Sequence, residues 1–271
     1  MKLFRLFLLS LLLFAPSGAQ EVENPPETAP VIIEEPVEEP ISEPPSPPKP
    51  LERVETFGYS VEKRPLIAHI FGDGPNRTLI IACVHGNEWA TPGVARLLRE
   101  HLLKHPEILR GRQVIIIPVV NPDGLIRKSR RNARNVDINR NYPGTWRRPR
   151  RGEGFAPGPS PASEPETQAM MRFVAQYPPK KIVSIHQPLN CMAYSGARSK
   201  PLAREMQKHN RFRIAEGVGY PTPGGFGGYC NNILKVPVVT LELPWQSPEA
   251  GWKKHASALL AAIRFETRQS Q

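Results

Sequence analysis

Several kinds of feature are scarce or missing in this chain of 271 residues, and each scarcity excludes something. With three cysteines at most one internal disulfide can form, so the chain is no small disulfide scaffold. Cys83 lies in apolar sequence and is expected to be buried, whereas a bond between Cys191 and Cys230 stays open. The apolar run Leu6–Ala15 is too short to span a bilayer comfortably, and no internal repeat is found in the part expected to fold.

Acidic residues are also scarce once the first 50 residues are set aside. Residues 51–271 carry 33 Lys and Arg against 17 Asp and Glu, a net charge of about +16. Such a surface attracts polyanions, here cell-wall polymer, anionic lipid or an acidic substrate. The basic residues follow no helical stripe and no aromatic–basic RNA motif occurs, so no nucleic-acid partner is expected. An ordinary solvated surface explains much of the excess.

The N-terminus has the pattern of an export signal. Lys2 and Arg5 form a basic start, the apolar run Leu6–Ala15 follows, and small residues up to Ala19 offer a cleavage site. Residues 1–19 are therefore predicted to be a signal peptide, which implies an exported chain in the periplasm or cell envelope. After cleavage no stable membrane insertion is expected, and an uncleaved anchor is the alternative.

The next segment, residues 20–55, is predicted to be an extended linker without a fold of its own. Residues 21–50 hold ten prolines and eight glutamates against one lysine, so they cannot bury enough apolar surface to form a core. A simple spacer is the favoured role. The rest has the composition of an ordinary globular protein, so residues 56–271 are predicted to form one domain, of unknown oligomeric state.

Apolar runs and helical patterns alternate along this domain. Strands are predicted at residues 66–71, 78–84, 113–120, 181–185 and 236–242. Helices are predicted at residues 92–104, 164–176, 200–213 and 249–265. Ser163 and Glu166 have capping-box spacing at the start of the second helix. Strands that are apolar on both faces imply a covered sheet, so the predicted fold class is α/β, a three-layer α/β/α sandwich with a mixed, largely parallel sheet.

Polar side chains follow the predicted strands, at the carboxyl ends where such sheets gather active groups. His85 and Glu88, in HGNE, lie three positions apart on a tight turn and can converge on a zinc ion. Such a match also arises by chance around a structural histidine. His186, in SIHQP at the end of another strand, is the natural third ligand, which leaves a fourth position for water.

Glu242 ends the last apolar strand, in VVTLELP. A carboxylate in such surroundings is costly unless it is paired or functional. Low polarity would raise its pKa toward neutrality, which suits a general base that takes a proton from water. A structural salt bridge with an arginine is the alternative interpretation.

An arginine-rich polar block, residues 121–143, lies between these strands. In its part VDINRNYP, which holds Asp137, Asn139, Arg140 and Asn141, apolar residues alternate with polar ones. Part of the block is therefore predicted to be tucked into a cleft where guanidinium groups can grip a carboxylate, and a position of all the arginines on the surface is the alternative. The loop that follows, residues 144–161, is basic and rich in Gly and Pro. It either rims the cleft or is a tolerated insertion.

The order HGNE, NPDG, an arginine before VDINRN, SIHQP and TLELP, over roughly residues 56–265, resembles the zinc carboxypeptidase family. The resemblance implies three ligands for one zinc ion per chain, a general base, an arginine that holds the oxyanion, and a pair that grips the leaving-side carboxylate. The resemblance implies His85, Glu88 and His186 as the zinc ligands and Glu242 as the general base. It implies Arg130 as the oxyanion arginine, and Asn139 and Arg140 as the pair that grips the carboxylate. Arg127, Arg131 and Arg134 are close by, so the register of the oxyanion arginine stays open.

Within the family, SIHQPLNC, GPSPASEPET and VVTLELP most resemble the murein peptide amidases, which cut the amide between γ-D-glutamate and meso-diaminopimelate. This implies an exported zinc metallopeptidase that hydrolyses that bond, or an adjacent one, in peptidoglycan stem peptides with a zinc-activated water. A carboxypeptidase acting on the C-termini of ordinary peptides and an inactive wall-binding module are the alternatives. Digestive carboxypeptidases carry a mobile tyrosine before the general base; here that segment is PGGFGGYCNN, so Tyr229 is the candidate for substrate binding.

Overall fold

The computed structural model describes residues 51–267. The predicted signal peptide, residues 1–19, and residues 20–50 of the predicted linker lie outside this range. Residues 52–55, also predicted as linker, instead form the start of strand β1 (Glu52–Tyr59). Because their backbone pairs with strand β2 (Pro65–Phe71), the folded domain includes them.

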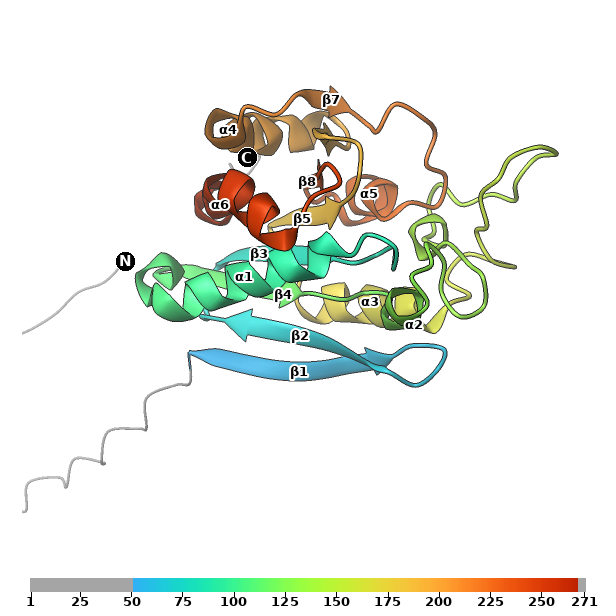
Figure 1. The fold of residues 1–271 in the computed structure, drawn as a ribbon, viewed down its shortest axis with the longest axis horizontal. Helices are drawn as coiled ribbons and strands as arrows, with labels where there is room; N and C mark the ends of the chain where they lie inside the picture. The colour runs from blue at the N-terminus through green and yellow to red at the C-terminus, as the bar shows by residue number, and fades with distance from the viewer. Residues whose placement is uncertain (1–50, 268–271) are drawn as a thin grey trace, which may run out of the picture. The chain divides into compact units, whose positions relative to one another are not determined.

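A mixed eight-stranded sheet runs through the described residues (Figure 1). Its strands, in spatial order, are β1, β2, β4 (Arg112–Ile117), β3 (Asn76–Ala82), β5 (Lys181–His186), β8 (Val238–Glu242), β6 (Cys191–Tyr194) and β7 (Ile214–Glu216). The four central strands β4, β3, β5 and β8 are mutually parallel. The pairs β1–β2, β2–β4 and β8–β6 are antiparallel. The prediction of a mixed, largely parallel sheet is confirmed.

Helices cover both faces of this sheet, which confirms the predicted α/β/α layers (Figure 1). On one face pack α1 (Ala90–Lys104), α4 (Lys200–Asn210) and α6 (Pro248–Arg264). On the other pack α3 (Pro165–Gln176) and the short α5 (Phe226–Tyr229). Shorter turns lie in the connections: η1 (Pro106–Leu109), α2 (Pro122–Ile126), η2 (Ile138–Arg140), η3 (Ala197–Ser199) and the π-helical η4 (Cys230–Leu234).

The predicted strands and helices all form, because their apolar residues supply both cores. In β3, Ile80 packs under the layer of α1, α4 and α6, while Leu79 and Ile81 pack toward α3. This alternation buries both faces of the central strands. The sequence does not predict β1, β6 and β7, because β1 is a partly exposed edge strand and the other two are short.

The start of α3 differs from the prediction. Glu164, not Ser163, is the N-cap residue, its side chain makes no capping hydrogen bond, and Pro165 takes the first helical position. Glu164 and Glu166 instead both accept hydrogen bonds from Nδ2 of Asn132, at 2.8 Å and 3.2 Å. The two carboxylates therefore tie the arginine-rich segment to α3.

Two smaller points concern cysteines and membrane spans. Cys83, Cys191 and Cys230 are all buried free thiols, so the structure contains no bond between the last two. Among the described residues, no helix combines the length and apolar character needed to cross a bilayer.

Candidate active site

The turn that carries His85 and Glu88 follows β3 at the carboxyl edge of the sheet. Gly86 lies so close to Gly124 that a Cβ atom on Gly86 would come within 1.9 Å of the Gly124 carbonyl carbon. A glycine is therefore required at this position. Asn121 fixes the position of Gly124, because its Oδ1 accepts a hydrogen bond from the Gly124 N–H at 2.9 Å. The HGNE and NPDG turns thus pack as one unit that orients His85 and Glu88.

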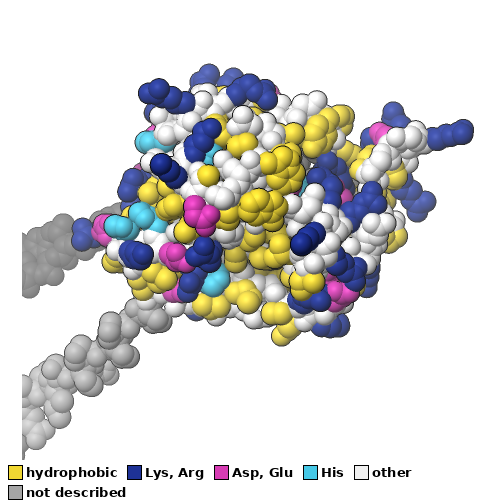
Figure 2. Space-filling view, in the orientation of Figure 1, with side chains coloured by type: hydrophobic (Ala, Val, Ile, Leu, Met, Phe, Trp, Pro, Cys, Tyr) yellow, Lys and Arg dark blue, Asp and Glu magenta, His cyan; other side chains and the backbone are white. Residues whose placement is uncertain are grey.

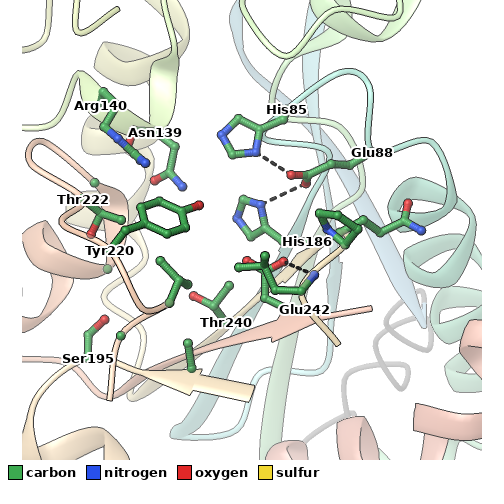
Figure 3. Close-up of a pocket in the computed structure, with 18 of the residues that line it drawn as sticks. His85, Glu88, Asn139, Arg140, His186, Ser195, Tyr220, Thr222, Thr240 and Glu242 are labelled. Atoms are coloured by element: carbon green, nitrogen blue, oxygen red, sulfur yellow. Dashed lines mark hydrogen bonds and ion pairs between the residues drawn. The ribbon is translucent and has the colours of Figure 1, made fainter. Parts of the chain in front are cut away.

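The three predicted zinc ligands meet at this edge because β3, which precedes His85 and Glu88, pairs with β5, which ends at His186 (Figure 3). Nδ1 of His85 lies 2.6 Å from Oε1 of Glu88, and Nδ1 of His186 lies 2.9 Å from Oε2. One donor atom from each residue lies within 4.8 Å of the others. All three residues are at most 3% exposed. Two imidazoles and one carboxylate form a ligand set suited to zinc.

The charges of this cluster fit a bound cation. Oε2 of Glu88 is buried and makes no hydrogen bond of good geometry with any described residue, despite the proximity of His186. Burial raises the pKa of Glu88, but the two histidines outweigh it and hold the pKa at about 2. Burial lowers the pKa of His85, but Glu88 and Asp137 outweigh it and raise the pKa to about 9. A divalent cation would stabilise such a buried ionised carboxylate between imidazoles.

Asp137 connects the cluster to the arginine-rich segment, a role that sequence reasoning missed. Its Oδ1 lies 3.2 Å from Nε2 of His85, and its Oδ2 accepts a hydrogen bond from Nε of Arg130 at 2.9 Å. Burial raises the pKa of Asp137, but His85 and Arg130 outweigh this effect and lower the pKa well below its ordinary value, so the carboxylate is ionised. A metal-binding histidine needs such a partner on its other nitrogen. The sequence signal for this role is the acidic residue Asp137 within the motif VDINRN.

Gln187, in SIHQP, is a second residue that sequence reasoning missed. Its buried side chain accepts the Ala90 N–H at 3.1 Å and donates to the Pro244 carbonyl at 2.9 Å. These two contact points lie two residues beyond Glu88 and two beyond Glu242. Gln187 therefore fixes the spacing between the metal cluster and the predicted base.

Glu242 ends β8 beside His186, its register partner on β5, and lines the same cavity as the ligands. It is 6% exposed, and its Oε2 accepts the Leu189 N–H at 3.4 Å. Within the described part of the chain no arginine or lysine forms an ion pair with it, which argues against a structural salt bridge. Burial raises the pKa of Glu242, with His186 opposing, so the carboxylate suits a proton acceptor.

Asn139 and Arg140 lie on the opposite side of the cavity (Figure 3). Oδ1 of Asn139 accepts the Phe226 N–H at 2.9 Å, which leaves its Nδ2 to face the cavity. Arg140 is 5% exposed and donates to the Asn139 carbonyl at 2.7 Å. It forms no ion pair with a carboxylate of residues 51–267; Asp137 lies within electrostatic reach, but its oxygens contact His85 and Arg130. The pair can hold an anionic group of a substrate.

The structure does not bring Tyr229, the residue predicted to bind substrate, to the cavity. Its side chain is 6% exposed and packs in the core, with ring centroids 5.5 Å from Tyr142 and 6.4 Å from Phe226. The cause is α5, which turns Phe226 and Tyr229 to the same inward face. Tyr220, which is 51% exposed and which sequence reasoning missed, lines the cavity instead, with its hydroxyl toward the ligand cluster (Figure 3).

The other predicted site residues share one cavity of about 100 Å³. They are His85, Glu88, Arg130, Asn139, Arg140, His186 and Glu242. A second cavity, of about 390 Å³, adjoins the first, since Arg130, Arg140 and Tyr220 line both. Arg147 and residues 153–156 of the basic loop also line it, so this loop rims the cleft.

A family model and individual relatives both place this chain in one protein family. The zinc carboxypeptidase family model matches residues 49–218. Murein peptide amidase A of Vibrio campbellii (strain ATCC BAA-1116) is 32% identical over 230 residues, 78% of this chain and 87% of that protein. Murein peptide amidase A of Escherichia coli (strain K12) is 30% identical over 208 residues, 71% of this chain and 81% of that protein.

Solved structures agree with this grouping. Murein-tripeptide amidase from Escherichia coli O157 has a TM-score of 0.61 at 27% identity, covering 81% of this chain and 100% of that chain. Bovine thrombin-activatable fibrinolysis inhibitor has a TM-score of 0.67 at 23% identity, covering 79% of this chain and 88% of that chain, a likeness of fold alone. The chain belongs to the zinc carboxypeptidase family and is a metallopeptidase of the hydrolase class.

Proposed function

We propose that this protein is an exported zinc metallopeptidase that hydrolyses an amide bond in peptidoglycan stem peptides, at the γ-D-glutamyl–meso-diaminopimelate bond or the bond next to it. The observation that carries the proposal is the meeting of His85, Glu88, His186 and Glu242 in one buried cavity at the carboxyl edge of the sheet. The relatives named murein peptide amidase support the choice of substrate.

His85 and His186, each through Nδ1, and Glu88 through its carboxylate would hold one zinc ion. When bound there, zinc supplies a Lewis acid that polarises a carbonyl group and lowers the pKa of water. Asp137 would accept a hydrogen bond from the Nε2–H of His85, which leaves the Nδ1 lone pair free to bind the metal. The orphaned buried oxygen of Glu88 supports this assignment.

Glu242 is the proposed general base. Because burial raises its pKa, it would take a proton from the attacking water and return it to the leaving amine. Arg130, oriented by Asp137, would stabilise the negative charge that develops on the carbonyl oxygen. Asn139 and Arg140 would grip the carboxylate of the leaving residue. Among the described residues, neither Nδ2 of Asn139 nor the guanidinium of Arg140 forms a hydrogen bond or ion pair with a carboxylate.

Features around the cavity also suit a wall substrate. Lys and Arg side chains are spread over the face seen in Figure 2, and the excess of basic residues attracts anionic wall polymer. The basic start and apolar run at residues 1–19 support export to the periplasm or cell envelope. Tyr220, half exposed at the cavity, would cover the bound peptide in the role first assigned to Tyr229.

Digestion of purified muropeptides, analysed by mass spectrometry, tests the proposal and identifies the bond. We expect the zinc-loaded protein to release a peptide that contains meso-diaminopimelate, a chelator to stop this release, and added zinc to restore it. Cleavage of ordinary L-peptides but not of stem peptides would identify a carboxypeptidase of general specificity instead. The absence of any chelator-sensitive product would contradict an enzymatic role and favour a wall-binding module.

A further inference from the structure

The second cavity beside the catalytic one has an excess of positive charge. We call it the arginine annex and define it by Arg131, Arg140, Arg147, Glu153, Phe155 and Tyr220. It has a volume of about 390 Å³ and opens from the side of the catalytic cavity that Arg140 lines. It therefore lies next to the proposed position of the leaving-residue carboxylate.

The acids that line the annex are already engaged. Oδ1 of Asp137 faces His85, and its Oδ2 accepts from Arg130. Glu153 accepts two hydrogen bonds from the guanidinium of Arg147, at 2.6 Å and 2.7 Å, and a third from the Arg150 N–H. The two acids are thus neutralised by their own partners.

Two arginines of the annex form no ion pair of their own with the described residues, although Arg140 lies within electrostatic reach of Asp137. Arg131 donates only to neutral groups, the Asn135 side chain and the Gly154 carbonyl, each at 3.2 Å. Arg140 donates to the Asn139 carbonyl. Neither forms an ion pair with a carboxylate in the described range 51–267. Because the oxygens of Asp137 already contact His85 and Arg130, the two guanidinium groups can bind an added anion in this cavity.

The outer wall of the annex is built in advance of any ligand. The guanidinium of Arg147 lies 5.1 Å from the centre of the Phe155 ring and donates two hydrogen bonds to Glu153. The Asp137 N–H donates to the Ala156 carbonyl at 2.8 Å, which fastens the loop to the arginine-rich segment. A ligand would therefore meet a formed pocket, which lowers the entropic cost of binding.

We propose that the arginine annex binds a second carboxylate on the leaving residue, with Arg131 as the main contact and Arg147 as the wall that keeps the pocket positive. The inference rests on the proposed function. meso-Diaminopimelate has one carboxylate near the scissile amide and another at the far end of its side chain, whereas lysine lacks the second. With the first carboxylate on Asn139 and Arg140, the second extends into the annex, and Arg131 selects residues that carry it.

Two substrates that differ by this carboxylate alone test the proposal: L-Ala-γ-D-Glu-meso-diaminopimelate and L-Ala-γ-D-Glu-L-Lys. We expect the zinc-loaded enzyme to prefer the first in kcat/KM by about tenfold or more, as for a hydrogen bond to a charged group. Arg131→Gln should bring this preference close to one. Arg134→Gln, which removes an exposed charge on the same segment outside the annex, should leave the preference unchanged.

A second pair of variants guards against a folding defect in the first. Arg147→Gln should also reduce the preference, because it leaves Glu153 without its partner and makes the pocket less positive. Arg148→Gln changes the next residue, which is exposed and does not line the annex, and should have no such effect. A preference that persists in both Arg131→Gln and Arg147→Gln would overturn the proposal.

The outcomes with the two substrates distinguish an error in the annex proposal from an error in the proposed function. If the active wild-type enzyme uses both substrates equally, the annex proposal is overturned and the proposed function stands. If it cleaves neither, the proposed function fails, and calorimetric binding of free meso-diaminopimelate and of L-lysine to the zinc-loaded protein decides the annex. Tighter binding of diaminopimelate that is lost in Arg131→Gln supports the annex, and equal binding overturns it.

Discussion

The two walls of the cleft are built from different parts of the fold. On one wall His85, Glu88, His186 and Glu242 follow three adjacent strands, and each is at most 6% exposed. On the other wall the arginines come from turns and from the loop of residues 144–161, and hydrogen bonds to backbone carbonyls and side chains hold them. We call these the strand wall and the arginine wall.

The difference separates the reaction from the choice of substrate. Bond hydrolysis needs a fixed geometry, which the register of β5 and β8 and the packed HGNE turn provide. Loops tolerate changes in sequence at little cost to the fold, so they are the natural place for specificity. We therefore propose that the strand wall carries out the reaction and that the arginine wall selects the leaving residue.

The largest expected effect lies on the strand wall. Glu88→Gln removes the charge between His85 and His186, so we expect the zinc content to fall to nearly zero and hydrolysis to fall to background. Elemental analysis and muropeptide digestion measure both. Glu100→Gln, at an exposed carboxylate on α1, is the control and should change neither. Full activity in Glu88→Gln would refute the assignment of the strand wall.

Glu242→Gln should separate metal binding from turnover within the same wall. We expect zinc content to stay near one ion per chain, while kcat falls by about 10²–10⁴ because the proton acceptor is lost. Steady-state kinetics on a stem peptide, alongside elemental analysis, make the comparison. A variant that loses its zinc as well would show that Glu242 acts as a ligand and not as a base.

A histidine outside both walls, His255, is expected to contribute to the pH dependence of the free energy of unfolding. His255, on α6, is fully buried, and burial lowers its pKa to about 4. The folded state binds a proton at His255 less tightly than the unfolded chain does. The contribution of neutral His255 to the free energy of unfolding is therefore complete above about pH 6.5 and is lost as the pH falls through about 4. The total is on the order of 3 kcal/mol.

Urea unfolding of the metal-free protein between pH 7 and pH 4 measures this term. The free energy of unfolding of the wild type should fall faster with decreasing pH than that of His255→Leu. The variant also loses the contact with Asn210, but that loss does not depend on protonation and shifts the whole curve. Parallel curves for the two proteins would show that His255 does not titrate in this range.

The smallest expected effect lies where the two walls join. Asp137→Asn weakens the contacts to both His85 and Arg130, so we expect a loss of about 10–100-fold in zinc affinity or activity. Competition with a chromogenic chelator measures the affinity. The double variant with Arg130→Gln should lose less than the sum of the two single effects in free energy. Unchanged zinc affinity in Asp137→Asn would mean that the walls are independent.

Sequence predicts the strand wall well because its determinants are local. Apolar runs identify the central strands, and each candidate residue stands directly after such a run. The parallel order of β3, β5 and β8 then brings His85, Glu88, His186 and Glu242 together. No long-range detail is needed beyond the rule that carboxyl ends share one edge.

The arginine wall is less predictable because its contacts are distant in sequence. The orientation of the four-residue helix α5 turns Tyr229 into the core. Tyr220, in the segment before this helix, lines the cavity. Gln187 joins segments around Ala90 and Pro244 that only the folded sheet brings together. Among the arginines, Arg130 is distinguished by its contact with Asp137, which spacing does not reveal.

The most direct test of the central claim is X-ray absorption at the zinc edge of the purified, zinc-loaded protein. The account predicts two imidazole nitrogens with oxygen ligands and no sulfur, although the thiol of Cys83 lies near the His85 backbone. A spectrum with a zinc–sulfur contribution, or with fewer than two imidazoles, would contradict the assignment of His85, Glu88 and His186.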